Sequence, residues 1–246
     1  MNARQTNAWM YRGNGMKLLR EFFAAYNIVN FPLGNSGTQM GGWFRKEIKS
    51  MADMNGLKMR IGGFAGQILA TLGAVPQTIP ASDTYQALEK GTIDAVEWSG
   101  PYDDLKLGFH TVAPYYYYPG WWEGAPQLSL YINRKQWESL SPEYQAVVTA
   151  AASHASLDIL SHYDAVNPVA MKQLIAEGAQ LHRFPIDFMD AARKTTHARY
   201  EQLNESNAAW RKVYGDYSKF LAEQYQWWGV NEFAFDSYMV QQQQQR

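Results

Sequence analysis

The pattern of apolar and polar positions changes along the 246-residue chain. In residues 15–26, apolar side chains such as Leu18 and Phe22 recur at helical spacing, which predicts an amphipathic helix. From there to residue 98, short strand-like apolar runs alternate with short helical segments and glycine-containing turns. The predicted strands are 27–34, 58–61, 75–80 and 93–98, and the helices between them are 63–73 and 83–91, the second capped by Ser82.

This alternation predicts an α/β fold with a substantially parallel sheet, because the connections are short enough for strand–helix–strand units. Ligands of such sheets bind at the carboxyl ends of the strands. Residues that follow each predicted strand are therefore the first candidates for a binding site.

Beyond residue 100 the pattern becomes aromatic and then helical. Residues 115–134 favour β structure, with 128–132 as the clearest strand. A long helix signal runs from Ser141 to Gly178, and Pro168 is expected to kink or break this helix. Residues 179–185 are predicted to return as a strand, and 186–239 to be mostly helical.

Composition narrows the class of protein. The chain has no cysteine, which excludes disulfides and thiolate chemistry. Its net charge of −1 gives no reason to expect nucleic acid or an anionic membrane as a partner. No apolar run is long enough to predict a membrane span. The aromatic content of 15% suits a closed binding surface as well as core packing.

Motifs of catalysis are missing from the sequence. The glycine run "GGFAG" lacks the lysine of a phosphate-binding loop and the spacing of a dinucleotide fingerprint. Ser99 has no nucleophile-elbow context. His154 and His162 are two helical turns apart, too far to share a metal ion. These observations favour a binding protein over an enzyme.

Polar and aromatic residues gather where the predicted strands end. Arg60 stands before two glycines, and it is either a solvent-facing strand residue or a two-pronged donor for a carboxylate. Glu97 and Trp98 end the strand 93–98, where the acid either faces solvent or binds a cation or hydroxyl. Two further segments, "GNSGTQMGGW" and "PGWWEGAPQ", offer Asn35, Gln39, Trp121, Trp122, Glu123 and Gln127.

Together these clusters describe one site for a small organic anion. An arginine would bind the carboxylate, acids and amides would bind a cation or a hydroxyl, and indoles would exclude water. Excluding water strengthens a charge-assisted pair.

Four segments carry a family resemblance: "GNSGTQMGGW", "LKMRIGGFAG", "YQALEKGTIDAVEWSGP" and "YYYYPGWWE". Over essentially the whole chain the sequence resembles the DctP-type solute-binding proteins of tripartite ATP-independent periplasmic (TRAP) transporters. It is most similar to their 2-oxo acid and monocarboxylate branch. The resemblance implies a periplasmic-binding-protein-like architecture of two α/β lobes with hinge strands and a long connecting helix. In the periplasm, the lobes close over a carboxylate, and the protein delivers this ligand to a permease in the membrane.

The resemblance also implies roles for individual residues. Arg60 would clamp the ligand carboxylate, and a bridging Na⁺ or Ca²⁺, with no organic cofactor, would lie beside it. The implied substrate-binding residues are Arg60, Gln39, Asn35, Trp98 and Trp122. The implied metal ligands are Glu97, Trp98, Gln39 and one of Glu123 and Gln127, a choice that stays open. Members of this branch also form homodimers through C-terminal helices.

Family members carry a signal peptide and a substantial first segment ahead of the position equivalent to Met1, so an amino-terminal truncation with an incomplete first lobe is expected. On this basis 1–26 is a remnant of lobe one and hinge, and 27–110 is the ligand-binding lobe two. Residues 111–140 are crossover strands, 141–185 the connecting helix and return strand, and 186–246 the helical region with the dimer contact. The alternatives are a lyase or isomerase with Glu97 as base, or a non-binding remnant that acts through its helices.

Overall fold

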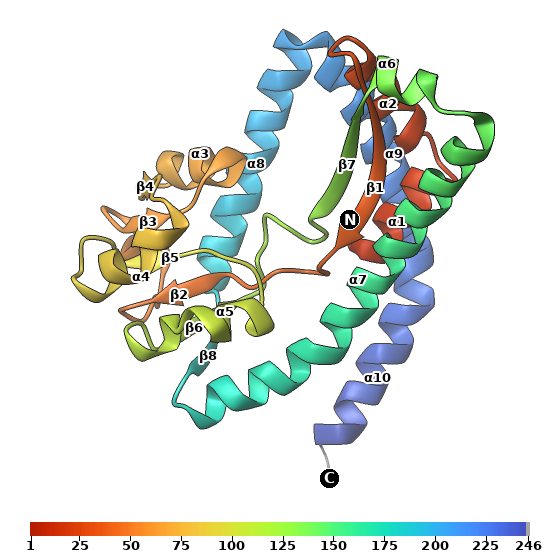
Figure 1. The fold of residues 1–246 in the computed structure, drawn as a ribbon. Helices are drawn as coiled ribbons and strands as arrows, with labels where there is room; N and C mark the ends of the chain where they lie inside the picture. The colour runs from red at the N-terminus through yellow and green to blue at the C-terminus, as the bar shows by residue number, and fades with distance from the viewer. Residues whose placement is uncertain (245–246) are drawn as a thin grey trace.

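The computed structural model describes residues 1–244, which form two β-sheets surrounded by helices (Figure 1). The larger sheet has the strand order β4-β3-β5-β2-β6-β8. Strand β3 is parallel to β4 and β5, and β6 is parallel to β8, whereas β2 is antiparallel to both of its neighbours. The strands are β2 (Gly42–Phe44), β3 (Lys58–Arg60), β4 (Val75–Gln77), β5 (Ala95–Val96), β6 (Tyr115–Tyr118) and β8 (Gln180–Arg183).

The smaller sheet pairs two strands that are distant in sequence. Strand β1 (Ile28–Asn35) is antiparallel to β7 (Gln127–Asn133), and the pairing ends with Asn35 opposite Gln127. Helix α7 (Pro142–Ala176) packs along β1 and continues past α5 (Pro101–Leu107) towards β8 (Figure 1). The long helix therefore contacts elements of both parts of the molecule.

The remaining helices cover the two sheets. Helices α1 and α2 pack on each other and on α9, while α3 lies against α8. No helix within residues 1–244 is long and apolar enough to cross a bilayer. These helices are α1 (Ala3–Tyr11), α2 (Gly15–Ala24), η1 (Met51–Met54), α3 (Gly63–Thr71), α4 (Ala81–Glu89), η2 (Phe109–Thr111), α6 (Arg134–Ser139), α8 (Ile186–Ser206), α9 (Ala208–Val230) and α10 (Glu232–Gln244).

The structure tests several local predictions. Helix α4 begins after Pro80, and Ser82 lies inside its first turn with its hydroxyl bonded to Asp83, so Ser82 is not the cap. Of the two outcomes predicted for Pro168, a kink or a break, only the break is excluded, because α7 is continuous across Pro168 and changes direction along its length (Figure 1). Three of the five neighbouring strand pairs of the larger sheet are parallel, in line with the predicted substantially parallel sheet. The two antiparallel pairs both involve the short strand β2, which the sequence analysis did not predict.

The core lies on both faces of the larger sheet. Tyr116 and Tyr117 point to opposite faces, and both are fully buried. Tyr116 stacks on Trp43 of β2 with ring centroids 3.8 Å apart, while Tyr117 packs on Phe184. A sheet covered on both sides explains why consecutive tyrosines appear where a half-exposed strand would alternate with polar residues.

Gly42 is the position where β2 most needs glycine. Its φ is +99°, and a Cβ there would lie 2.3 Å from the carbonyl oxygen of Val96 in β5. Gly42→Ala should therefore lower the free energy of unfolding by roughly 2–4 kcal/mol, measured by urea denaturation. Gly215, exposed in α9 with nothing within 4 Å of a built Cβ, is the control. Gly215→Ala should raise stability by roughly 0.5–1 kcal/mol, and an equal loss in both variants would contradict the steric explanation.

Candidate functional site

Arg60 is the last residue of β3 and faces Glu97 rather than solvent. The parallel pairing of β3 with β5 sets Arg60 opposite Val96, so the residue after β5 comes beside the arginine. Its Nη1 donates to the Glu97 carbonyl at 2.8 Å and lies 3.5 Å from the Glu97 carboxylate. Its Cζ is 4.8 Å from the centre of a Trp98 ring. The arginine is thus held by a carbonyl and an indole face.

Most of the donor capacity of Arg60 is still open. A guanidinium has five N–H groups, and within residues 1–244 Arg60 uses only Nη1 in hydrogen bonds. Its side chain is 24% exposed, so the remaining N–H groups can meet a ligand. The fork geometry of these groups matches a carboxylate.

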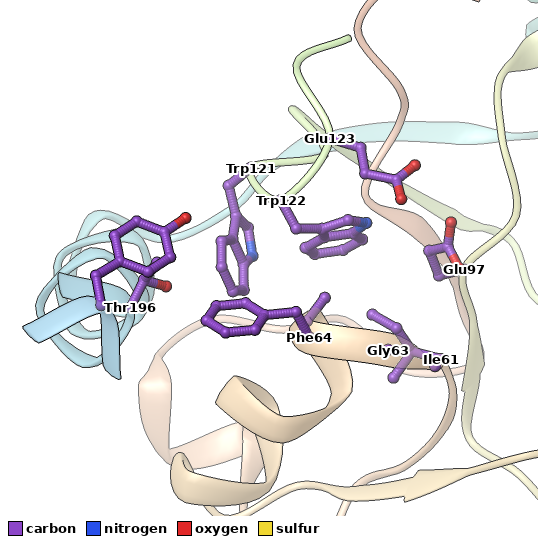
Figure 2. Close-up of a pocket in the computed structure, with 11 residues that line it drawn as sticks. Ile61, Gly63, Phe64, Glu97, Trp121, Trp122, Glu123 and Thr196 are labelled. Carbon is purple, nitrogen blue, oxygen red and sulfur yellow. The ribbon is translucent and has the colours of Figure 1, made fainter. Parts of the chain in front are cut away.

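Glu97 carries the most unusual electrostatics of the site. Burial, followed by repulsion from Glu123, raises the pKa of Glu97 to about 8, although Arg60 acts in the opposite direction. Burial also raises the pKa of Glu123. Figure 2 shows the two carboxyl groups turned towards each other at one end of a cavity. Two acids held together in this way favour a bound proton or a cation between them.

The cavity beside these acids has a volume of about 380 Å³ and a largely aromatic wall. Trp121 and Trp122 meet edge to face with ring centroids 5.0 Å apart. Both indole Nε1 atoms are buried and have no hydrogen-bond partner within residues 1–244. They are donors that a ligand or water can satisfy. The lining residues are Ile61, Gly62, Gly63, Phe64, Ala65, Glu97, Trp121, Trp122, Glu123, Thr196 and Tyr200 (Figure 2).

Gln39 is tied to the segment that carries Glu123. The Gln39 N–H donates to the Glu123 carbonyl at 3.1 Å, and the Gly120 N–H donates to the Gln39 carbonyl at 2.8 Å. The side-chain Oε1 of Gln39 is buried with no hydrogen-bond partner in the described part of the chain. This oxygen is an acceptor without a donor, which suits a cation ligand.

Asn35 and Gln127 lie together, in a different setting. Asn35 is fully buried, and its Oδ1 accepts the Gly37 N–H at 2.9 Å, so this oxygen holds the turn after β1. The Gln127 amide donates to the Gly34 carbonyl at 2.9 Å. Gln127 lines a second cavity of about 690 Å³, which shares Trp121, Trp122, Glu123 and Tyr200 with the first.

The structure brings most of the sequence-predicted residues to one place. Arg60, Glu97 and Trp98 contact one another, while Trp122, Glu123 and Gln39 lie on segments joined to them by the cavity wall or by backbone hydrogen bonds. Asn35 makes no hydrogen bond to this group within residues 1–244.

Sequence reasoning did not single out part of the aromatic wall. Phe64 stacks on Tyr200 of α8 with ring centroids 5.6 Å apart and on Trp210 of α9 at 6.3 Å. Phe64 follows the glycine pair after Arg60, a position that could have drawn attention to it. Tyr200 lies on an ordinary helical stretch 140 residues from Arg60, and no local pattern marks it.

A cation fits this site by its chemistry. Within residues 1–244, no three histidine, cysteine, aspartate or glutamate side chains are grouped so that they could hold a metal ion between them. The available set is instead the two carboxylates of Glu97 and Glu123 with the unpartnered amide oxygen of Gln39. Oxygen ligands of this kind suit hard cations such as Ca²⁺.

Comparisons with known proteins place the chain in a family. The family model described as bacterial extracellular solute-binding protein, family 7 (DctP), matches residues 1–207. The chain belongs to this family, the solute-binding proteins of TRAP transporters. This confirms the predicted family, which is a family of solute-binding proteins rather than of enzymes.

Three relatives are particularly similar. A monocarboxylate 2-oxoacid-binding periplasmic protein of Nostoc sp. is 42% identical over 238 residues, which is 97% of this chain and 65% of that protein. A TRAP solute-binding protein from Bordetella bronchiseptica, a dimer with calcium and picolinate in one active site, is 51% identical over 100% of this chain and 73% of its own, with a TM-score of 0.96. One from Pseudoalteromonas atlantica, with sodium and pyruvate, is 40% identical over 96% and 72%, with a TM-score of 0.91.

These matches confirm the predicted fold class. This chain spans about two thirds of the length of the Nostoc relative, 65%.

The raised pKa of Glu97 predicts how stability changes with pH. Folded Glu97 holds its proton up to about pH 8, whereas the unfolded side chain loses it near 4.5, so stability should fall as pH rises between these values. Each unit of pKa difference corresponds to about 1.4 kcal/mol. Between pH 5 and pH 8, the wild type should lose on the order of 2–4 kcal/mol more than Glu97→Gln, measured by urea denaturation without ligand.

Asp104, whose pKa is also raised, is common to both proteins, so the difference between their curves reports Glu97 together with its repulsion from Glu123 and Asp104. Glu138 is exposed, and Glu138→Gln should follow the wild-type curve. Parallel curves for wild type and Glu97→Gln would show that Glu97 is not buried in this way.

Proposed function

We propose that the protein captures a small 2-oxo or 2-hydroxy monocarboxylate of the pyruvate type, together with Na⁺ or Ca²⁺, and delivers it to a TRAP permease. The observation that carries this proposal is the placement of Arg60 beside the acid pair Glu97 and Glu123 at the edge of an aromatic cavity. The ligands of the Bordetella and Pseudoalteromonas relatives support the choice of ligand class and of cation.

The charges of the site explain why carboxylate and cation would bind together. A carboxylate held by Arg60 would lie close to Glu97, which lies 3.5 Å from the same guanidinium. A cation between the acids would offset that repulsion and the mutual repulsion that helps raise the pKa of Glu97. When bound, the cation supplies a positive charge for the ligand oxygens, and the partly buried setting strengthens both interactions.

Within this proposal Glu123 is a better metal ligand than Gln127. Glu123 lines both cavities and is coupled electrostatically to Glu97. The Gln127 side-chain nitrogen donates to the carbonyls of Gly34 and Leu128, and its buried Oε1 has no partner within residues 1–244, but Gln127 lines only the second cavity, away from Glu97. Gln127 would then shape the end of the β1–β7 pair.

The proposed motion is closure about the smaller sheet. Strands β1 and β7 pair with each other and not with the larger sheet, and α7 runs along β1. A two-stranded connection of this kind can bend while the larger sheet moves as a unit. Closure would bring the wall formed by Trp121 and Trp122 over the ligand.

Arg60→Ala tests the ligand assignment. The substitution removes the carboxylate donor, so calorimetric titration with pyruvate should show binding abolished, a loss of roughly 100-fold or more. Chelating divalent ions and replacing Na⁺ with choline should weaken pyruvate binding to the wild type.

Arg45, which follows β2 and is exposed, is the matched control. Arg45→Ala should bind pyruvate as the wild type does. Wild-type affinity in Arg60→Ala would sink the assignment of Arg60, and no response of the wild type to pyruvate with either cation would sink the ligand class.

We further propose that the protein forms a homodimer through α9 and α10, as suggested by the dimeric Bordetella relative. Helix α10 projects from the body of the molecule (Figure 1). The two helices expose an unusual number of large apolar side chains, and such surfaces mark protein contacts. These residues are Tyr225, Trp227, Val230, Phe233, Phe235, Tyr238, Met239 and Val240.

The double variant Phe233→Asp/Phe235→Asp should shift the sedimentation coefficient from that of a dimer to that of a monomer, because charge at a buried contact opposes association. Val169 on α7 is equally exposed, at 67%, and Val169→Asp should leave the dimer intact. A wild type that sediments as a monomer at all concentrations would contradict the proposal.

A further inference from the structure

Asp104 is a buried carboxylate that the proposed binding chemistry does not use. It lies in the first turn of α5 and is 1% exposed. One carboxylate oxygen, Oδ2, accepts the Trp43 indole N–H at 3.0 Å and the Tyr116 hydroxyl at 2.6 Å. The other oxygen, Oδ1, accepts the backbone N–H of Ser99 at 3.3 Å. Three elements, β2, β6 and the segment after β5, therefore meet at this one side chain.

Ser99 connects Asp104 to the binding site. The Ser99 carbonyl accepts the N–H of Met40 at 2.9 Å, and the next residue back, Gln39, donates its N–H to the Glu123 carbonyl. On the other side, Glu97 donates its N–H to the Arg60 carbonyl at 2.9 Å. The four segments that carry the candidate site are thus joined by backbone hydrogen bonds. The Asp104 side chain holds this series of hydrogen bonds in place at Ser99.

We propose that Asp104 is a positioning residue, which holds the segment 97–99 in the register that sets Glu97 against Arg60 and, through Met40, places Gln39 beside Glu123. The role rests on the proposed function, because the affected property is ligand affinity. Asp104 itself touches none of the candidate ligand-binding side chains through a hydrogen bond within residues 1–244.

A carboxylate at this position is costly if packing is its only purpose. Burial raises the pKa of Asp104 to about 7, although the hydrogen bonds from Tyr116 and Trp43 lower it. Replacing buried polar groups by apolar ones of similar shape is often neutral or stabilising. An apolar side chain cannot accept hydrogen bonds from three donors on three different segments. Positioning of these segments requires such acceptors.

Asp104→Asn separates positioning from packing, and because it also removes a charge that acts on Glu97, the exchange measurement below distinguishes positioning from that charge effect. The variant keeps the side-chain volume, but one oxygen becomes an NH₂ group that faces either the Ser99 N–H or the Trp43 N–H, donor against donor. Pyruvate affinity, measured by calorimetry with Ca²⁺ present, should fall about tenfold or more. Amide hydrogen exchange in the ligand-free variant should rise selectively in residues 97–100 and 39–41.

Asp94→Asn is the matched control. The Asp94 carboxylate accepts the Lys58 N–H at 2.9 Å and so joins the start of β3 to the start of β5, at the ends away from Arg60 and Glu97. This variant should lose stability without a change in pyruvate affinity or in exchange at 97–100. The proposal is overturned if Asp104→Asn loses stability but binds pyruvate like the wild type.

Exchange in the ligand-free wild type tests the proposal even if Asp104→Asn does not fold. The Ser99 and Met40 amides should be protected well beyond those of exposed loops, and unprotected amides at both positions would also overturn the proposal. If the wild type fails to bind pyruvate, the proposed function fails. The exchange comparison between Asp104→Asn and Asp94→Asn then decides the positioning role independently.

Discussion

The parallel pairing of β3 with β5 is the constraint on which the site depends. It requires the chain after Val96 to run beside Arg60, and the Glu97 N–H completes the contact by donating to the Arg60 carbonyl. A one-residue slip in this pairing would turn each side chain of β5 to the other face of the sheet. The guanidinium would then face a different residue, so strand register, more than any single side chain, sets the charge arrangement of the cavity.

Burial gives this arrangement its electrostatic character and makes it costly. Glu97 is 13% exposed and Arg60 24%, so both charges are partly removed from water while the acid also faces Glu123. Partly buried charges that are not fully paired lower stability, but they bind an incoming opposite charge more strongly than exposed ones. In the proposed function, this loss of folding stability is the cost of a cavity that is ready to bind an anion and a cation.

Local patterns predicted the elements well where one residue type decides the outcome. Glycine ended α3, proline began α7, and alternating strands and helices indicated the α/β class. The site residues near strand ends were found because strand ends meet at one edge of a sheet, but their binding roles came from family resemblance. Strand β2 was missed because it is only three residues long and begins at the second glycine of the pair Gly41–Gly42, which in a sequence indicates a turn. Tyr200 was missed because its place in the cavity wall depends on how α8 packs, which no local pattern encodes.

Helix α7 gives the molecule a fixed length. Its 35 residues correspond to about 52 Å of continuous helix, which neither stretches nor shortens appreciably. Because it contacts β1 and α5, these two elements stay at a set distance along its axis. In the proposed closure, relative movement would therefore be angular, and the cavity would open as a wedge, with small displacements near the helix and larger ones at the far rim. A larger ligand would then hold the two parts of the molecule at a wider angle. A long substituent would have the largest effect at the rim of the cavity, where a small rotation changes its width most.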